Sequence, residues 1–342
     1  MPTLREKLIG NFNRRVVNRM MDSERGRRLF QSIAKPYLAG SSLEQALETI
    51  KHHHERRILS TFDVLGEAAR TKEESDRYIK AYIDMIDLLR NTFPKETPSS
   101  VSVKPTSICA FEGDSPQTIV EGMILEGRLE ALVKHAKDNG ICVTLDMEDS
   151  KWTYVSIQVG KQMWMKGYDN FGICLQSRLD RTQADIREIF SKTYPVPKEK
   201  MRVRACIGIY EEPEGAENDK EIAKERLLRR VDDLFGYGVY VEIATHDPRF
   251  VRRIIREVIV PRGIHRDRFE FQFLKGVHNG EVLAQKLSAE GYKVRFYMPT
   301  ELREGDGTPY MQRRLLANPT LLTLGAKNVI QRVLFGANGN SN

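Results

Sequence analysis

From about residue 57 onward, short apolar runs rich in β-branched and aromatic residues alternate with longer stretches whose apolar positions recur at helical spacing. Two of the helical stretches, 119–140 and 225–238, end in glycine, which is common just beyond a helix C-terminus. The pattern predicts one strand for each apolar run. The predicted strands are residues 57–64, 101–108, 141–148, 171–178, 202–209, 239–246, 269–276 and 293–300.

Strand and helix in strict alternation predict a parallel sheet, because each helix returns the chain to the starting edge. Eight such units are the number that closes into a (β/α)8 TIM-type barrel, the predicted α/β fold class. An open, doubly wound sheet is the alternative. It is less favoured because no GxGxxG motif follows any of the predicted strands.

Two domains are expected. Residues 1–50 are helical in pattern and rich in charge, which suggests an N-terminal helical arm, with a break at the Gly-Ser-Ser of residues 40–42. The barrel is expected over residues 51–342. Its closing helix is predicted at 309–317, because Thr308 suits an N-cap and Pro309 a first helical position.

Composition and charge narrow the class of protein. The 342 residues are 40% hydrophobic, with no apolar stretch of membrane-spanning length and no signal peptide, so a cytoplasmic protein is expected. Residues 1–60 hold 12 Lys and Arg against 6 Asp and Glu, most of the net charge of +7. Without a nucleic-acid-binding motif, this bias favours weak attraction to a membrane surface over nucleic-acid binding. A solvated helical surface is the simpler interpretation, and the sequence gives no indication of the oligomeric state.

Cysteine and histidine give no metal-binding pattern. Cys109, Cys142, Cys174 and Cys206 stand singly in apolar segments without a CxxC pair, as buried thiols do. The consecutive histidines 52–54 lie in a helical stretch, where neighbouring side chains point in different directions. No metal site is therefore predicted.

Polar residues collect where the predicted strands end, and in a barrel those ends meet at one mouth, where catalysis takes place. Buried charges are costly unless paired, so this clustering predicts an active site. A satisfied local hydrogen bond is the simpler interpretation of each residue taken singly. The residues are Lys104, Asp146, Glu148, Asp149, Gln176, Arg178, Arg204, Thr245, His246 and Tyr297.

The predicted closing helix offers a second group of polar side chains. At 3.6 residues per turn, Tyr310 shares a helix face with Arg313 and Arg314. Guanidinium groups bind carboxylates in a planar, bidentate manner that lysine does not reproduce. The face is suited to a small carboxylate, although a solvated basic face has the same pattern.

In order from about residue 57 to 318, the chain contains the segments TFDVLGE, VSVKPTSI, LDMED, LQSRLDR, VRACIGIYEEP, ATHDPR, EFQFLKG and the closing YMP…YMQRRLLAN. Together these segments resemble the single-domain bacterial proline dehydrogenases. The resemblance implies a distorted (β/α)8 barrel with a flavin, FAD rather than FMN. It also implies oxidation of L-proline to pyrroline-5-carboxylate and electron transfer to a membrane quinone by a peripheral membrane protein.

The resemblance also implies roles for individual residues. Asp146 and Arg204 would act in catalysis, Asp146 by organising the cationic cluster and Arg204 beside flavin N5. The expected substrate-binding residues are Lys104, Leu274, Tyr297, Tyr310, Arg313 and Arg314. The expected flavin-binding residues are Met147, Gln176, Arg204, Ile207, Gly208, Ile209, Thr245 and His246.

Three positions depart from the family pattern. Ile207 stands where the family has lysine, Lys275 where it has tyrosine, and Ala317 where it has glutamate. Lys275 is hypothesised to replace the cation missing at 207. These changes leave two alternatives open beside proline oxidation: oxidation of another cyclic amino acid such as hydroxyproline, or a barrel that binds flavin or an imino acid without turnover.

Overall fold

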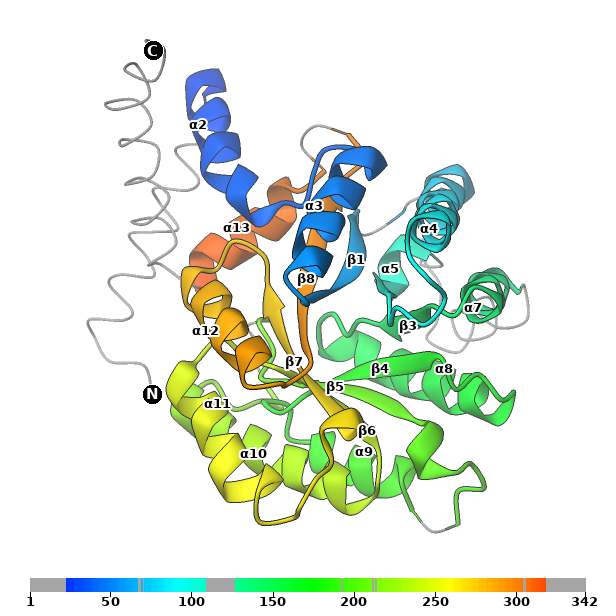
Figure 1. The fold of residues 1–342 in the computed structure, drawn as a ribbon, viewed down its shortest axis with the longest axis vertical. Helices are drawn as coiled ribbons and strands as arrows, with labels where there is room; N and C mark the ends of the chain where they lie inside the picture. Colours follow the sequence, from blue (N-terminus) through cyan, green and yellow to red (C-terminus); the bar gives the residue numbers. More distant parts are fainter. Residues whose placement is uncertain are drawn as a thin grey trace.

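The computed structural model describes residues 23–66, 69, 71–108, 127–191, 193–210, 212, 214–303 and 306–317. Within them, parallel strands form a closed barrel in the order in which they occur along the chain. Figure 1 shows these strands enclosed by a ring of helices. The strands are β1 (Leu59–Leu65), β2 (Ser100–Val103), β3 (Cys142–Leu145), β4 (Phe171–Gln176), β5 (Arg202–Cys206), β6 (Tyr240–Ala244), β7 (Phe269–Leu274) and β8 (Val294–Glu301).

Closure of the barrel is made by the first and last strands, with Thr61 of β1 opposite Tyr297 of β8. The predicted (β/α)8 barrel is thereby confirmed, and an open doubly wound sheet is excluded. The α-helices are α2 (Glu24–Ala34), α3 (Leu43–Glu55), α4 (Lys72–Thr92), α5 (Pro105–Ile108), α7 (Arg128–Asp138), α8 (Thr153–Met165), α9 (Thr182–Ile189), α10 (Lys220–Gly236), α11 (Pro248–Ile254), α12 (His278–Ala289) and α13 (Thr308–Ala317). Shorter helical turns are η1 (Lys35–Tyr37), η2 (Ser150–Trp152), η3 (Lys198–Lys200), η4 (Ile255–Ile259) and η5 (Arg266–Arg268).

Each predicted strand exists, but most are shorter than expected, and β2 and β3 have only 4 residues each. The run 101–108 was predicted as one strand, whereas β2 ends at Val103 and α5 begins at Pro105. Proline has no N–H to donate to a sheet and is well suited to a first helical turn. Lys104 consequently stands at the turn between strand and helix.

Helix starts follow short polar side chains that accept from the first free amides. Ser42 accepts from the Gln45 amide at 3.3 Å, at the predicted break before α3. Asp219 accepts from Glu221 and Ile222 at 2.9 and 3.1 Å at the start of α10. These caps satisfy amides that have no partner within the helix.

The N-terminal part of the described chain is attached to the end of β8. The Ala39 amide donates to the Pro299 carbonyl at 2.7 Å, and the Glu301 amide donates to the Gly40 carbonyl at 3.1 Å. Helix α3 runs through residue 50, where the arm was expected to end, and the division into arm and barrel stays a prediction. Residues 1–22, which carry part of the basic charge, lie outside the described residues. No helix in the described ranges is both long and apolar enough to cross a membrane.

Apolar side chains on the outer face of the barrel pack against the helices. Helix α8 approaches β4 closely at Gly160, where a Cβ atom would lie 2.7 Å from Cγ2 of Ile173. Alternate positions of β4 and β5 point inward, and those of β5 include Arg202 and Arg204. The apolar core therefore lies between strands and helices, whereas the barrel interior carries charge.

Candidate active site

A buried ion pair joins the ends of the first two strands. Lys104 follows β2 and its Nζ donates to Oδ1 of Asp63, in β1; both side chains are buried. Burial raises the pKa of Asp63, against the opposing effect of Lys104. Burial also opposes the charge of Lys104, but the attraction of Asp63 and Asp146 outweighs it and raises the lysine pKa. The ammonium group is thus held as a cation at the mouth of the barrel.

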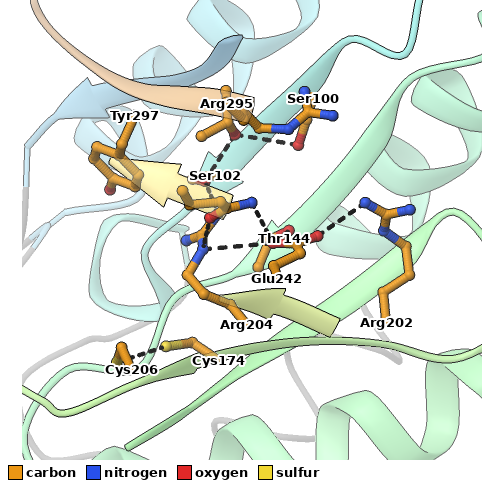
Figure 2. Close-up of polar contacts among 12 residues, drawn as sticks. Ser100, Ser102, Thr144, Cys174, Arg202, Arg204, Cys206, Glu242, Arg295 and Tyr297 are labelled. Carbon is orange, nitrogen blue, oxygen red and sulfur yellow. Dashed lines mark hydrogen bonds and ion pairs between the residues drawn. The ribbon is translucent and has the colours of Figure 1, made fainter. Parts of the chain in front are cut away.

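Arg204 is the centre of the polar cluster in the barrel (Figure 2). Its guanidinium donates to Asp146, to Gln272 Oε1 at 2.6 Å and to Ser102 Oγ at 2.9 Å. Glu242 forms a further ion pair, with 3.5 Å between Nε and Oε2. Burial opposes the charge of Arg204, but the carboxylates of Asp146 and Glu242 outweigh this effect and raise the pKa of Arg204 above its ordinary value. Contacts from four strands or strand ends thereby fix the orientation of the guanidinium.

Tyr297 shares Asp146 with Arg204. The Tyr297 hydroxyl donates to Asp146 Oδ2 at 2.6 Å, and the Arg204 guanidinium carbon lies 5.4 Å from the centre of the tyrosine ring. Burial and the Asp146 charge both raise the pKa of Tyr297. The phenol therefore stays protonated and acts as a hydrogen-bond donor, which keeps Asp146 in place.

A second layer of charge lies deeper in the barrel. Glu242 accepts from Arg202 at 2.9 Å and from Gln272 at 2.8 Å, and Gln272 also donates to Glu270 at 2.7 Å. Glu270 forms a two-point contact with Arg295, at 2.6 and 3.0 Å. Buried charges are costly without partners, and each charge in this deeper layer has one. The layer beneath the mouth is therefore made of paired charges.

Helix α13 begins at Thr308, one residue before the predicted start, and brings a tyrosine and an arginine together. The Arg314 guanidinium carbon lies 5.3 Å from the centre of the Tyr310 ring, and that ring is 8% exposed. Burial raises the pKa of Tyr310, and the charges of Asp63 and Lys104 also act on it. Tyr310 is thus within electrostatic range of the Lys104–Asp63 pair. The Arg313 and Ala317 side chains lie outside the described residues.

Gln176 and Gly208 form a second region of the mouth, beside the cationic cluster. The Gln176 amide donates to the carbonyls of Met147 and Glu148 at 3.2 and 2.7 Å. Its Oε1 is buried and has no hydrogen-bond partner among the described residues. A Cβ atom on Gly208, whose φ is 101°, would lie 2.2 Å from this oxygen, so only glycine permits the approach. The unused acceptor suits a ligand that donates an N–H, such as a flavin ring.

His246 is buried and supports the end of β7. Its Nε2 accepts from the Leu274 amide at 2.7 Å, which places the proton of the neutral ring on Nδ1. Burial and the Arg314 charge lower the pKa of His246 to about 3. The ring is thus neutral at physiological pH, and it positions Leu274. Thr245, the preceding residue, is also buried.

The neutral state of His246 predicts loss of stability in mild acid. In the unfolded chain histidine titrates near 6.5, so the stabilisation is complete above that pH and falls as pH decreases toward 3. Between pH 6.5 and pH 5 the expected loss is about 2 kcal/mol of unfolding free energy. Urea unfolding at both values would measure it. The His246→Gln variant keeps a hydrogen-bond acceptor but does not titrate, so its unfolding free energy should fall by about 2 kcal/mol less than that of the wild type between pH 6.5 and pH 5. The same pH dependence in both proteins would contradict the assignment.

The other expected flavin-binding residues lie near this region with their own contacts. Met147 is buried, and its sulfur accepts from the Thr153 hydroxyl at 3.7 Å. Ile207 packs partly against the apolar core. Ile209 is half-buried.

Lys275 is not placed as hypothesised. Its Nζ donates to the Pro36 carbonyl at 2.8 Å, in the N-terminal segment, and burial lowers its pKa. The amine therefore secures the N-terminal segment. This contact argues against Lys275 as a substitute for the cation missing at Ile207.

Three polar residues expected at the mouth form local contacts. Glu148 accepts from the amide and hydroxyl of Thr106 at 3.0 and 2.8 Å. Asp149 caps η2 through the Lys151 amide at 3.2 Å. Arg178 donates to the Tyr210 carbonyl. These contacts stabilise the loops after the strands. For Glu148, Asp149 and Arg178 the structure therefore shows the simpler alternative, a satisfied hydrogen bond.

The acidic and amide partners of the cations were not predicted from the sequence. Asp63, Glu242 and Gln272 lie inside strands and are buried. The signal was present, since each is a polar residue at an inward position of an apolar run. Inward direction becomes evident only once the register of neighbouring strands is known.

A closed parallel barrel with paired charges at the carboxyl ends of its strands defines a (β/α)8-barrel enzyme. The family model described as proline dehydrogenase matches residues 46–321. The chain belongs to the proline dehydrogenase family, and the protein is therefore an oxidoreductase.

Curated relatives match over nearly the whole chain. Proline dehydrogenase of Deinococcus radiodurans is 28% identical over 323 residues, covering 94% of this chain and 96% of the relative. Proline dehydrogenase 2 of Bacillus subtilis is 26% identical, with 86% of this chain and 89% of the relative covered.

Solved structures support the fold. Proline utilization A from Bdellovibrio bacteriovorus, inactivated by N-propargylglycine, superposes with a TM-score of 0.75 at 21% identity. The match covers 91% of this chain, which spans about a third (34%) of that longer protein. A Bradyrhizobium japonicum proline utilization A mutant gives a TM-score of 0.67 at 22% identity, covering 87% of this chain and 34% of its own.

Proposed function

We propose that the protein is a flavin-dependent proline dehydrogenase that oxidises L-proline to pyrroline-5-carboxylate. The observation that carries this proposal is the pair of buried cations at the mouth, Lys104 and Arg204, each held by an internal carboxylate, together with the buried Tyr310 and its neighbour Arg314 on α13. Family membership and the names of the relatives support proline as the substrate.

The substrate carboxylate is assigned to Arg314 and Lys104, with Arg313 added by the family resemblance. Within the described ranges, no carboxylate lies within ion-pair distance of Arg314, so its guanidinium is available for an anionic ligand. Lys104 has three donors, and Asp63 is its ion-pair partner among the described residues. A bound carboxylate would offset the repulsion between these cations.

Aromatic and apolar side chains are assigned to the pyrrolidine ring. Tyr297 and Tyr310 are buried phenols near the cations, and Leu274 ends β7 beside Tyr297, its partner in the sheet register. Such walls orient the ring, and orientation is a large part of catalysis in a bimolecular reaction. The same cations disfavour a protonated amine, so proline would bind with the neutral nitrogen that imine formation requires.

The flavin is assigned to the region of Gln176 and Gly208, adjoining Arg204. Gln176 Oε1, which has no partner among the described residues, can accept a hydrogen bond from an N–H of the flavin ring. Gly208 has no side chain that would block this oxygen. When bound, the flavin would accept the hydride that leaves the proline ring. Arg204, immobilised by its four partners, would stabilise negative charge developing there. FAD is proposed over FMN, with Met147, Ile207, Ile209, Thr245 and His246 as further contacts.

The absorption spectrum of the purified protein tests this function. Anaerobic L-proline should bleach the oxidised flavin band, and heat-released cofactor should be identified as FAD. If flavin is bound but only another cyclic amino acid, such as hydroxyproline, reduces it, the substrate assignment is wrong. If no flavin is present and none can be loaded, the barrel binds ligands without this chemistry.

A membrane quinone is proposed as the electron acceptor. This assignment, like peripheral attachment to the inner face of the membrane through the basic N-terminal region, rests on the resemblance and the charge distribution. Reduction of a water-soluble quinone by the proline-reduced protein would support it.

A further inference from the structure

Two cysteines on adjacent strands face each other inside the barrel. Cys174 of β4 lies opposite Arg204 of β5 in the sheet register, and Gln176 lies opposite Cys206. The cysteine side chains share the inward face, and their sulfur atoms are 3.5 Å apart (Figure 2). The two cysteines stand singly in the sequence, but the strands that carry them are neighbours, so the fold brings them together.

We propose that Cys174 and Cys206 form a reversible oxidation site, which hydrogen peroxide converts to an intramolecular disulfide. A disulfide has a sulfur–sulfur length near 2.05 Å, so the sulfurs must approach by about 1.5 Å. The two cysteines occupy diagonal positions of neighbouring strands, so closing this gap requires rotation of both side chains together with a small shift of the strands. This inference is independent of the proposed substrate and of the flavin.

The two thiols are unequal, which assigns an order to the reaction. Cys206 is half-buried, whereas Cys174 is 5% exposed. The hydrogen bond with Cys174 and the Arg204 charge lower the pKa of Cys206, while the same hydrogen bond raises the pKa of Cys174. Because the thiolate is the nucleophile, Cys206 reacts first and Cys174 resolves the product.

The chemistry balances in two steps. The Cys206 sulfur attacks a peroxide oxygen, forming an S–O bond and breaking the O–O bond, and one water leaves with a thiol proton. The Cys174 sulfur then attacks the sulfenic sulfur, forming the S–S bond and breaking the S–O bond, and a second water leaves. Two thiols lose two electrons and peroxide gains them.

Peptide mapping of the whole protein tests the proposal. The protein is treated with peroxide in its native state, free thiols are alkylated, and trypsin is added without reductant. Cleavage should release peptides 167–178 and 205–220 joined, with the mass of both minus two hydrogens, and dithiothreitol should separate them. Cys142, in peptide 138–151, serves as the internal control and should remain alkylated.

Two variants check the order of reaction. In Cys174→Ser, Cys206 should accumulate as a sulfenic acid that dimedone labels, whereas Cys206→Ser should leave Cys174 reduced at the same peroxide concentration. Independent oxidation of Cys142 at an equal rate would show non-specific reactivity and overturn the proposal. The absence of the joined peptides in the wild-type protein would overturn it even if neither variant folds.

Discussion

Replacing Arg204 by methionine should reduce the free energy of unfolding by about 3–5 kcal/mol, the cost of removing one partner of a buried ion pair. Asp146 would lose its guanidinium partner and keep only the Tyr297 hydroxyl, while Glu242 would retain Arg202. Asp146 is therefore the group that suffers most. Urea unfolding monitored by circular dichroism would measure the change.

A charge-removal cycle distinguishes this electrostatic origin from simple loss of packing. Adding Asp146→Asn to the Arg204→Met variant should recover part of the lost stability, because the uncompensated charge disappears. Arg256→Met is the matched control, since that side chain is 74% exposed and should change stability by less than about 0.5 kcal/mol. If the double variant is no more stable than Arg204→Met, the ion-pair explanation is wrong.

Replacing Arg314 by methionine should lower kcat/KM for L-proline by about 10²–10³-fold, as removal of one partner of a desolvated charge pair costs about 2–5 kcal/mol. The flavin content should be unchanged, because the residues assigned to the flavin lie on other elements. Arg314→Lys keeps the charge but not the planar fork, so its loss should be smaller. Steady-state kinetics with the flavin spectrum recorded on the same preparations would measure both effects.

Two controls limit the interpretation of that result. Tyr310→Phe removes only a hydroxyl and retains the ring under Arg314, so it should affect kcat/KM less than Arg314→Met. Arg256→Met again reports the effect of losing a remote positive charge. If the Arg314→Met enzyme keeps the wild-type KM and kcat, the assignment of the substrate carboxylate to Arg314 is wrong.

The fold was predictable because periodicity is a local property of the chain. Apolar runs alternating with helical stretches identified each strand, and closure followed from the number of units. The error at 105–108 also has a local cause, since Pro105 was read as part of a strand although it cannot donate to one. Polar residues at strand ends correctly indicated a mouth, and Lys104, Asp146, Arg204 and Tyr297 meet there.

Contacts between residues far apart in the sequence were not predictable from the same signals. Lys104 binds Asp63, Lys275 binds the Pro36 carbonyl, and Cys174 meets Cys206; all are distant in sequence. Such pairs depend on strand register and on the direction of flexible side chains, which a single sequence does not encode by spacing. The chemical types at the site were therefore evident, while their partners required the structure.

The pairing of β1 with β8 has a consequence for the order of folding. Strand β1 cannot pair with β8 until residues near 297 have been synthesised, so one edge of β1 stays unpaired while most of the chain is being made. The contacts of Ala39 and Gly40 with the end of β8 likewise form only after that strand has been synthesised. Barrel closure is consequently a late, high-contact-order event, and the exposed edge of β1 is where an incomplete chain is most prone to pair with a neighbour.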